Sequence, residues 1–285
     1  MRKFLGPEFA SLDEKMQTGY KLQRQKDLDT EVCKVWLEAW SDFLDLYDKL
    51  GTTTIKEFDH RFNGTQSVSN WVQDLESALW NVGLDDPHFL TERVTLCQLL
   101  LQKFGDDGET LRNENTRRSL AECYARLQQQ DKADALFDDW LKKDTHWGWG
   151  WIGWADCYIF GQPDAKNLEK AEQLLRQGLA IAAVRDRIDI MERLANVLDE
   201  LGKGNEADEL RLQIKQELSS KPQSIYDTSS TNPAFEKMLQ ALCSPQAAST
   251  FDSLDTSSAF ENKHRPCQCG SGKKFKKCCG RGLKY

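Results

Sequence analysis

The chain has 285 residues, enough for one sizeable domain with appendages or for a short array of helical repeats. Charged residues make up 29% and hydrophobic residues 39%, and no run of eighteen apolar residues occurs, so we expect a soluble protein without a transmembrane helix. Residues 1–5 begin like a secretory signal, but Gly6, Pro7 and Glu8 interrupt any apolar core, so a cytoplasmic location is expected.

The net charge of −7 is unevenly distributed along the chain. From Glu261 to the end there are eight Lys or Arg residues and one Glu, whereas residues 1–260 hold 30 basic and 44 acidic residues. An acidic body is therefore joined to a basic tail. Such a tail suits an acidic partner such as ribosomal RNA, an acidic protein face or anionic lipid. The alternative is that the tail lysines only solvate a small segment with few apolar residues.

In the first part of the chain, the periodic pattern of apolar residues predicts some helices more strongly than others. Residues 1–26 are polar and weakly periodic, and they are predicted to be weakly structured or to form a short helix. From Asp27, apolar residues recur at spacings of three and four until Gly51 ends the pattern. This spacing predicts one long amphipathic helix.

Two further helices are predicted before the chain breaks at four residues rich in Gly and Asp. The first is capped by Ser69 or Asn70, and the second runs from about Asp86 to Phe104, with a proline in its first turn. Residues 27–108 are therefore predicted to form divergent helical hairpins.

An internal repeat follows. Ala121 and Tyr124 recur 34 residues later as Ala155 and Tyr158, and a related pattern starts again at Ala195. This interval is the period of the tetratricopeptide repeat, in which each unit is a helical hairpin that buries its apolar face against its neighbours. Residues 109–218 resemble three such repeats. They begin near Glu114, Gly148 and Ile188, with Ala133, Ala171 and Ala207 at the small-residue position of each second helix.

The repeat register also predicts which side chains line the concave groove that this family uses to hold partners. Trp149, beside small glycines, is a candidate anchor for a peptide, although it could instead be a packing residue. The lining is mixed and leans acidic, so a basic or neutral protein or peptide segment is the expected ligand. The predicted groove residues are Arg118, Glu122, Trp149, Ile152, Asp156, Glu192, Asn196, Asp199 and Glu200.

Beyond the repeats, the composition changes to Ser, Thr, Pro and Gln. Residues 219–261 are predicted to be a flexible linker with a short helix near 233–243, which either caps the repeats or binds a partner.

Four of the nine cysteines cluster in the last segment, residues 262–285. A Cys-x-Cys pair and a Cys-Cys pair flank a flexible turn that contains Gly-Ser-Gly. Two short chelating segments of this kind can fill a tetrahedral four-thiolate zinc site, although iron is a rival metal. The predicted ligands are Cys267, Cys269, Cys278 and Cys279. The other five cysteines are scattered in apolar contexts, which predicts that they are small buried side chains.

This segment closely resembles the SEC-C motif, the zinc-binding tail of the SecA translocase motor and of several other bacterial proteins. All four ligand positions are occupied, and the Gly-Ser-Gly turn and lysine-rich spacer also match. In SecA the motif binds the SecB chaperone and contributes to ribosome and lipid contacts, so the resemblance implies a role near the ribosome or nascent proteins. The basic surface would comprise Lys273, Lys274, Lys276 and Lys277.

The pattern as a whole predicts an all-α protein: a tetratricopeptide-like solenoid of helical hairpins with a small C-terminal zinc knuckle. The sequence holds no recognisable catalytic constellation, so a non-enzymatic adaptor is predicted. Its solenoid would bind a protein while its zinc tail docks on a ribosome, a SecB-like chaperone or a translocation component. The alternative is an accessory protein that binds RNA through the basic tail. An enzyme built from scattered groove carboxylates is a remote third possibility.

Overall fold

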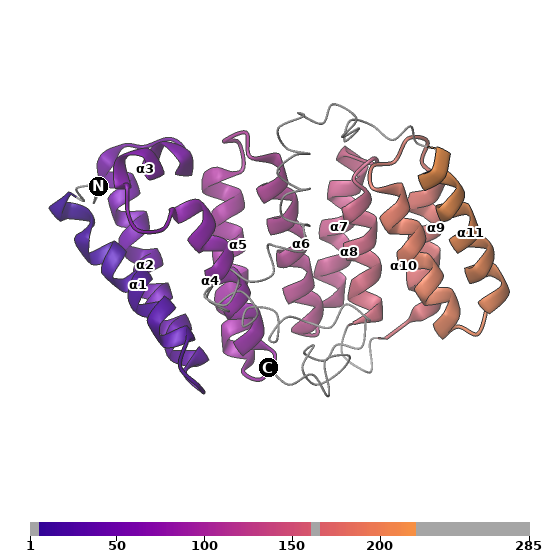
Figure 1. The fold of residues 1–285 in the computed structure, drawn as a ribbon, viewed down its shortest axis with the longest axis horizontal. Helices are drawn as coiled ribbons and strands as arrows, with labels where there is room; N and C mark the ends of the chain where they lie inside the picture. Colours follow the sequence, from indigo (N-terminus) through magenta and orange to yellow (C-terminus); the bar gives the residue numbers. More distant parts are fainter. Residues whose placement is uncertain (1–5, 161–165, 221–285) are drawn as a thin grey trace, which may run out of the picture. The chain divides into compact units, whose positions relative to one another are not determined.

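The computed structural model describes residues 6–160 and 166–220, which belong to one compact unit and, over these ranges, form helices and connecting turns (Figure 1). This confirms the predicted all-α fold. The elements are η1 (Pro7–Phe9), α1 (Ala10–Gln23), α2 (Asp29–Leu50), α3 (Ile55–Phe62), α4 (Val68–Gly83), α5 (Pro87–Phe104), α6 (Thr110–Arg126), α7 (Gln130–Lys143), α8 (Gly148–Ile159), α9 (Leu168–Ala180), α10 (Arg187–Glu200) and α11 (Gly204–Ser220).

Helix α1 is longer and better packed than the weak periodicity of residues 1–26 indicates. It lies against α2, where a Cβ atom on Gly19 would stand only 2.0 Å from the indole Nε1 of Trp36. The same indole donates a hydrogen bond of 3.0 Å to the Met16 carbonyl. The close approach of the two helices depends on the missing side chain at Gly19, a feature that hydrophobic periodicity does not register.

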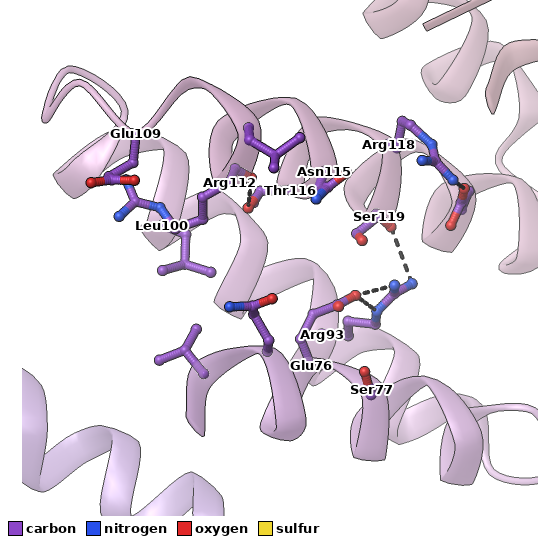
Figure 2. A pocket seen from close by; sticks show the side chains of 14 residues that line it. Glu76, Ser77, Arg93, Leu100, Glu109, Arg112, Asn115, Thr116, Arg118 and Ser119 are labelled. Carbon is purple, nitrogen blue, oxygen red and sulfur yellow. Dashed lines mark hydrogen bonds and ion pairs between the residues drawn. The ribbon is translucent and has the colours of Figure 1, made fainter. Parts of the chain in front are cut away.

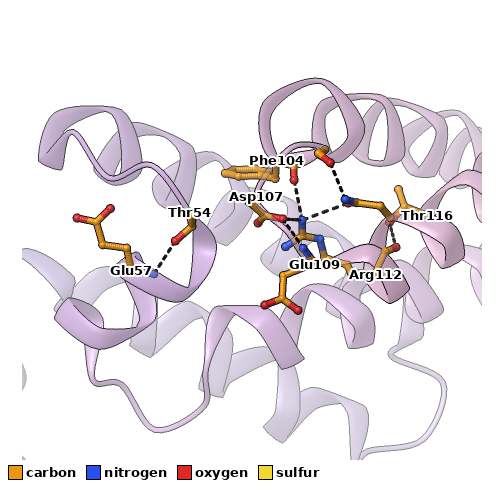
Figure 3. A network of polar contacts seen from close by, with 9 residues as sticks. Thr54, Glu57, Phe104, Asp107, Glu109, Arg112 and Thr116 are labelled. Atoms are coloured by element: carbon orange, nitrogen blue, oxygen red, sulfur yellow. Dashed lines mark hydrogen bonds and ion pairs between the residues drawn. The ribbon is translucent and has the colours of Figure 1, made fainter.

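Helix α3 was not predicted, because eight residues are too few for a clear periodic signal. Its start is fixed by Thr54, whose hydroxyl accepts a hydrogen bond of 3.0 Å from the backbone N–H of Glu57 (Figure 3). Phe58 and Phe62 then pack edge-on against Phe9. This aromatic cluster closes the end of the core formed by α1 and α2.

The predicted cap of α4 was wrong by two residues. Ser67 is the cap, and its hydroxyl accepts from the Asn70 backbone N–H at 3.3 Å, whereas the Ser69 hydroxyl donates to Asp59. The prediction for α5 is confirmed, since Asp86 caps a helix that ends at Phe104.

A polar network holds the turn between α5 and α6 (Figure 3). The Arg112 guanidinium donates to the Phe104 carbonyl at 2.7 Å and to Asp107 at 2.5 Å. The next residue, Asn113, donates from its side-chain amide to the Gly105 carbonyl at 2.7 Å. These bonds satisfy carbonyls at the C-terminal end of α5 and fix where α6 begins.

Helices α6 to α11 form three consecutive hairpins, as the repeat predicted. The first helices, α6, α8 and α10, pack against one another, and each also packs against the helix that follows it. The crossings are close because small residues occupy them. Those residues are buried: Ala121, Ala155 and Ala195 on the first helices, and Ala133, Ala171 and Ala207 on the second.

Several predictions lie outside the described residues. Helix α11 reaches Ser220, so the first two positions of the proposed linker are helical. The rest of the linker, the short helix near 233–243 and the segment 262–285 with its four clustered cysteines and its lysines are not described. Among the described helices, none is long and apolar enough to cross a membrane.

Candidate partner-binding groove

Several hollows lie beside the helices α4, α5, α6, α8 and α10. One of them, here called the α4–α6 hollow, has a volume of about 490 Å³ and is lined by residues of α4, α5 and α6 together with Glu109 (Figure 2). Its wall from α6 includes Arg118, Ser119 and Glu122, and at its edge the side chain of Leu111 is 72% exposed. Two of the predicted groove residues, Arg118 and Glu122, therefore line this hollow.

A buried ion pair lies at the base of the α4–α6 hollow (Figure 2). Arg93 of α5 has a side chain only 6% exposed and pairs with Glu76 of α4 through two of its nitrogens. It also donates to the Ser119 carbonyl at 3.3 Å and to the Cys123 Sγ at 3.1 Å. Burial alone would lower the pKa of Arg93, but the neighbouring Glu76 carboxylate raises it, so this arginine is charged and its donors are committed.

A second hollow, the α6–α8 hollow, has a volume of about 280 Å³. It shares the lining residues Arg93 and Glu122 with the first, so the two hollows are neighbours. Asp156 also lines it, so Glu122 and Asp156, predicted from different repeats, meet at one place. Its full lining is Trp80, Arg93, Glu122, Ala125, Arg126, Asp156, Cys157 and Phe160.

The groove continues between α8 and α10. The α8–α10 hollow, of about 180 Å³, is lined by Trp149, Ile152, Glu192 and Asn196 among others. Glu192 and Asn196 also line a further hollow of about 280 Å³ beside α11. Two contacts join this part to the rest: Arg118 of α6 stacks on the Trp149 ring, and Arg193 of α10 pairs with Asp156.

Trp149 is packed on one side and lines the α8–α10 hollow on another. Its ring is half-buried, and the Arg118 guanidinium carbon lies 4.8 Å from the ring centroid. Ile152, one turn further along α8, is almost fully buried and forms the floor of the hollow. By contrast, Trp147 and Trp151 are buried packing residues. The tryptophan-rich segment thus contributes Trp147 and Trp151 to the core, while Trp149 lines the hollow.

Asp156 has an unusual electrostatic setting. Burial raises its pKa from the ordinary 3.8 to about 6, and the Glu122 carboxylate adds to this rise, while Arg193 and Arg118 oppose it. The ion pair between Arg193 Nε and Asp156 Oδ1 measures 3.2 Å. A carboxylate with this pKa changes its charge near neutral pH.

Asp199 and Glu200 are placed differently from the other predicted groove residues. Asp199 pairs with Arg211 of α11, and Glu200 pairs with Lys166 at 2.8 Å. Both carboxylates are engaged by basic residues of the same chain, so they are weaker candidates for direct contact with a partner.

Sequence reasoning missed several residues that line the α6–α8 hollow, among them Trp80, Arg93 and Phe160. Trp80 and Arg93 come from the divergent helices α4 and α5, to which the repeat register does not apply. Phe160 follows directly after α8, and its side chain is 61% exposed. It occupies the thirteenth position of the middle repeat, the position that predicted Glu200 in the third repeat, so the register applied evenly to all three repeats would have found it.

The described residues, 6–160 and 166–220, contain no group of three or more His, Cys, Asp or Glu side chains arranged to hold a metal. Their four cysteines, Cys33, Cys97, Cys123 and Cys157, are buried and unpaired. Burial raises the pKa of each of these thiols, so none is a reactive thiolate. The four predicted metal ligands, Cys267, Cys269, Cys278 and Cys279, lie outside the described residues.

Comparison with known proteins bears on the two parts separately. No curated protein matches the chain. Among solved structures, it is similar to "MamA 41-end from Desulfovibrio magneticus RS-1", with a TM-score of 0.39 and 12% identity over 77% of this chain and 100% of that chain. Residues 266–281 match the family model described as the SEC-C motif, which confirms the resemblance drawn from the cysteine spacing. The chain is a helical-repeat protein that carries a SEC-C motif.

Proposed function

We propose that the protein is an adaptor whose groove on α6, α8 and α10 binds a segment of a protein partner. The observation that carries this proposal is the presence of a hollow beside each of the first helices α6, α8 and α10, the first two of which share Arg93 and Glu122 in their linings. A row of shallow hollows with charged rims and single exposed aromatic or aliphatic side chains suits an extended peptide, which places one side chain in each.

Site-specific photocrosslinking tests this proposal. Benzoylphenylalanine replaces Leu111, which lines the α4–α6 hollow, or Leu212 on α11, which is 57% exposed and serves as the matched control. Irradiation of native lysate should crosslink a specific protein to the Leu111 position and leave the Leu212 position uncrosslinked. Equal crosslinking at both positions, or none at Leu111, contradicts the proposal.

The second part of the proposal concerns the C-terminal segment. Cys267, Cys269, Cys278 and Cys279 would hold one zinc ion as thiolates, and the lysines between them would dock on a second surface of a ribosome, chaperone or translocation component. The support is the SEC-C match at residues 266–281 and the excess of basic residues after Glu261. Pulldown with the full chain and with a chain ending at Ser258 should identify partners that require the tail.

The excess of basic residues also favours a second candidate, direct binding of RNA by Lys273, Lys274, Lys276 and Lys277. The dependence of affinity on salt distinguishes the two. Phosphate contacts by single-stranded RNA give a slope of about −0.7 per contact in a plot of log affinity against log salt. A slope near zero removes this candidate.

A further inference from the structure

The walls of the α6–α8 hollow are apolar, acidic and basic in different places. Trp80, Ala125 and Phe160 give it apolar surface, and Glu122 and Asp156 give it two carboxylates. Two guanidinium groups line it as well, those of Arg93, which pairs with Glu76, and of Arg126. Its volume of about 280 Å³ lies below the roughly 300–1,000 Å³ typical of pockets for whole small molecules. One long side chain with an apolar stem and a polar end fits this combination better than a separate small molecule.

The two carboxylates retain capacity for another donor. Glu122 receives one long contact of 3.5 Å from Arg118, and Asp156 receives one of 3.2 Å from Arg193. An ionised carboxylate can accept about four hydrogen bonds. The two carboxylates also repel each other, since Glu122 raises the pKa of Asp156. A cation between them would relieve this repulsion.

The aromatic walls are compatible with a cation as well. The guanidinium carbon of Arg93 lies 4.6 Å from the centroid of the Trp80 ring, and that of Arg193 lies 5.4 Å from the centroid of Phe160. Both rings already pack against guanidinium groups of the chain itself, which shows that the rim tolerates positive charge beside aromatic surface.

We propose that the α6–α8 hollow is a specificity pocket for an arginine or lysine side chain of the bound peptide. The stem of that side chain lies along Phe160 and Trp80, and its cationic end is held by Glu122 and Asp156. This inference rests on the proposed binding of a peptide in the groove and specifies one residue of that peptide. If the bound peptide instead places an acidic side chain in the hollow, held by the arginines at its rim, the proposal is wrong.

The pocket should respond to pH through Asp156. The charged groups facing it are Glu122 and Arg118 on α6 and Arg193 on α10, and Arg93 of α5 and Arg126 of α6 line the same hollow. Because the pKa of Asp156 is about 6 without ligand, acidification below that value removes one of the two carboxylate charges that hold the cation. Binding of a cationic side chain should therefore tighten as the pH rises from about 5 to about 7.5.

The test uses the full chain loaded with zinc and a phage-displayed library of short random peptides as the probe. Peptides selected near neutral pH should share one Arg or Lys. Replacing that residue with norleucine should weaken binding about 10-fold to 100-fold in fluorescence anisotropy, because a charge-assisted hydrogen-bonded contact is lost. Glu122→Gln and Asp156→Asn should produce losses of the same size, and Asp156→Asn should flatten the pH dependence.

The control is Asp138→Asn on α7, where the carboxylate is exposed and pairs with Lys142. It removes the same charge away from the groove and should leave the affinity unchanged. Circular dichroism confirms that each variant folds, and Phe160→Ala provides a second variant of the pocket.

The possible failures are distinguishable. If no peptide is selected, or if selected peptides bind Trp149→Ala and Phe160→Ala as tightly as wild type, groove binding itself is overturned. If binding is lost in Trp149→Ala but the peptides contain acidic residues, or are insensitive to Glu122→Gln and Asp156→Asn, the groove proposal stands and the cation pocket is overturned.

Discussion

Arg93 links three helices through one buried guanidinium. It pairs with Glu76 of α4, donates to the Ser119 carbonyl of α6 and packs on Trp80. A buried ion pair adds little stability compared with an apolar replacement of the whole pair, but loss of one member leaves the other unpaired. The main effect of the arginine is therefore to fix the relative positions of α4, α5 and α6. Its net contribution to the free energy of unfolding is small.

Arg93→Met tests this role. It keeps an apolar stem but leaves the Glu76 carboxylate and the Ser119 carbonyl without their donor. We expect the free energy of unfolding to fall by about 3 kcal/mol, at the lower end of the usual range because Glu76 keeps some contact with water. Urea denaturation followed by circular dichroism measures the change. Lys142→Met, which breaks an exposed pair on α7, is the control and should match wild type.

Asp156 should make the stability of the helices α1 to α11 depend on pH. Its pKa is raised to about 6 in the folded state from an ordinary 3.8, so the unfolded chain ionises first as the pH rises. The free energy of unfolding therefore falls as the pH rises from about 4 to about 6. Above this window the total loss is about 1–3 kcal/mol relative to a chain with a neutral residue at this position.

The measurement for Asp156 compares urea denaturation of wild type and Asp156→Asn across this pH window. The variant should gain stability relative to wild type as the pH rises, and the difference should level off above about pH 7. A difference that does not vary with pH would show that Asp156 titrates normally.

At the scale of elements, the hairpin of α8 is joined to the next one through backbone. The Arg185 N–H donates to the His146 carbonyl at 2.9 Å, which ties the turn before α10 to the turn before α8. Gly148 opens α8 at this place, and a Cβ atom there would stand 2.0 Å from the Arg185 carbonyl oxygen. The glycine is needed for the close approach of the two turns, not for an unusual backbone angle.

Gly148→Ala should therefore push the two turns apart. We expect a loss of about 1–3 kcal/mol in the free energy of unfolding, as for other substitutions that overfill a packed site. Gly204→Ala at the first residue of α11 is a matched control, because a Cβ atom there meets nothing within 4 Å. The control should be neutral or more stable by up to about 1 kcal/mol. Equal unfolding midpoints for the two variants would contradict this account.

For the whole molecule, the two parts differ in what stabilises them. The helical unit, meaning helices α1 to α11, has its own core of buried apolar side chains, such as Trp36, Phe43 and Leu194. The SEC-C segment, residues 266–281, is too short to bury a comparable core and would derive its folding free energy from the metal.

Zinc removal should consequently act locally. Metal analysis of protein purified without oxygen should find about one zinc per chain, and a strong chelator should remove it. The helical circular dichroism signal and the thermal unfolding midpoint of the helical unit should not change. Binding of partners that require the tail should be lost. A cooperative loss of helix on chelation, or iron in place of zinc, would contradict this prediction.

Sequence reasoning succeeded where a signal is local or strictly periodic. The 34-residue interval from Ala121 to Ala155 and the related pattern at Ala195 predicted helices at these places, and all three alanines are buried in helices. Stacked helical hairpins favour small residues where their helices meet. Sequence reasoning was weaker for α1 and α3. Helix α1 depends on a single glycine facing Trp36, and α3 is held by a cap and an aromatic cluster.

The sequence by itself determined the class of this protein: an all-α array of hairpins followed by a four-cysteine motif, since both follow from spacing along the chain. Only the tertiary structure decided how the inner face is built. The α6–α8 hollow combines Trp80 of α4, Glu122 of α6 and Phe160, which follows α8. The pairing of Asp199 with Arg211 engages a carboxylate that the register placed in the groove. These contacts depend on the angles at which the helices cross and on which charged side chains pair. The spacing of residues along the chain does not determine either.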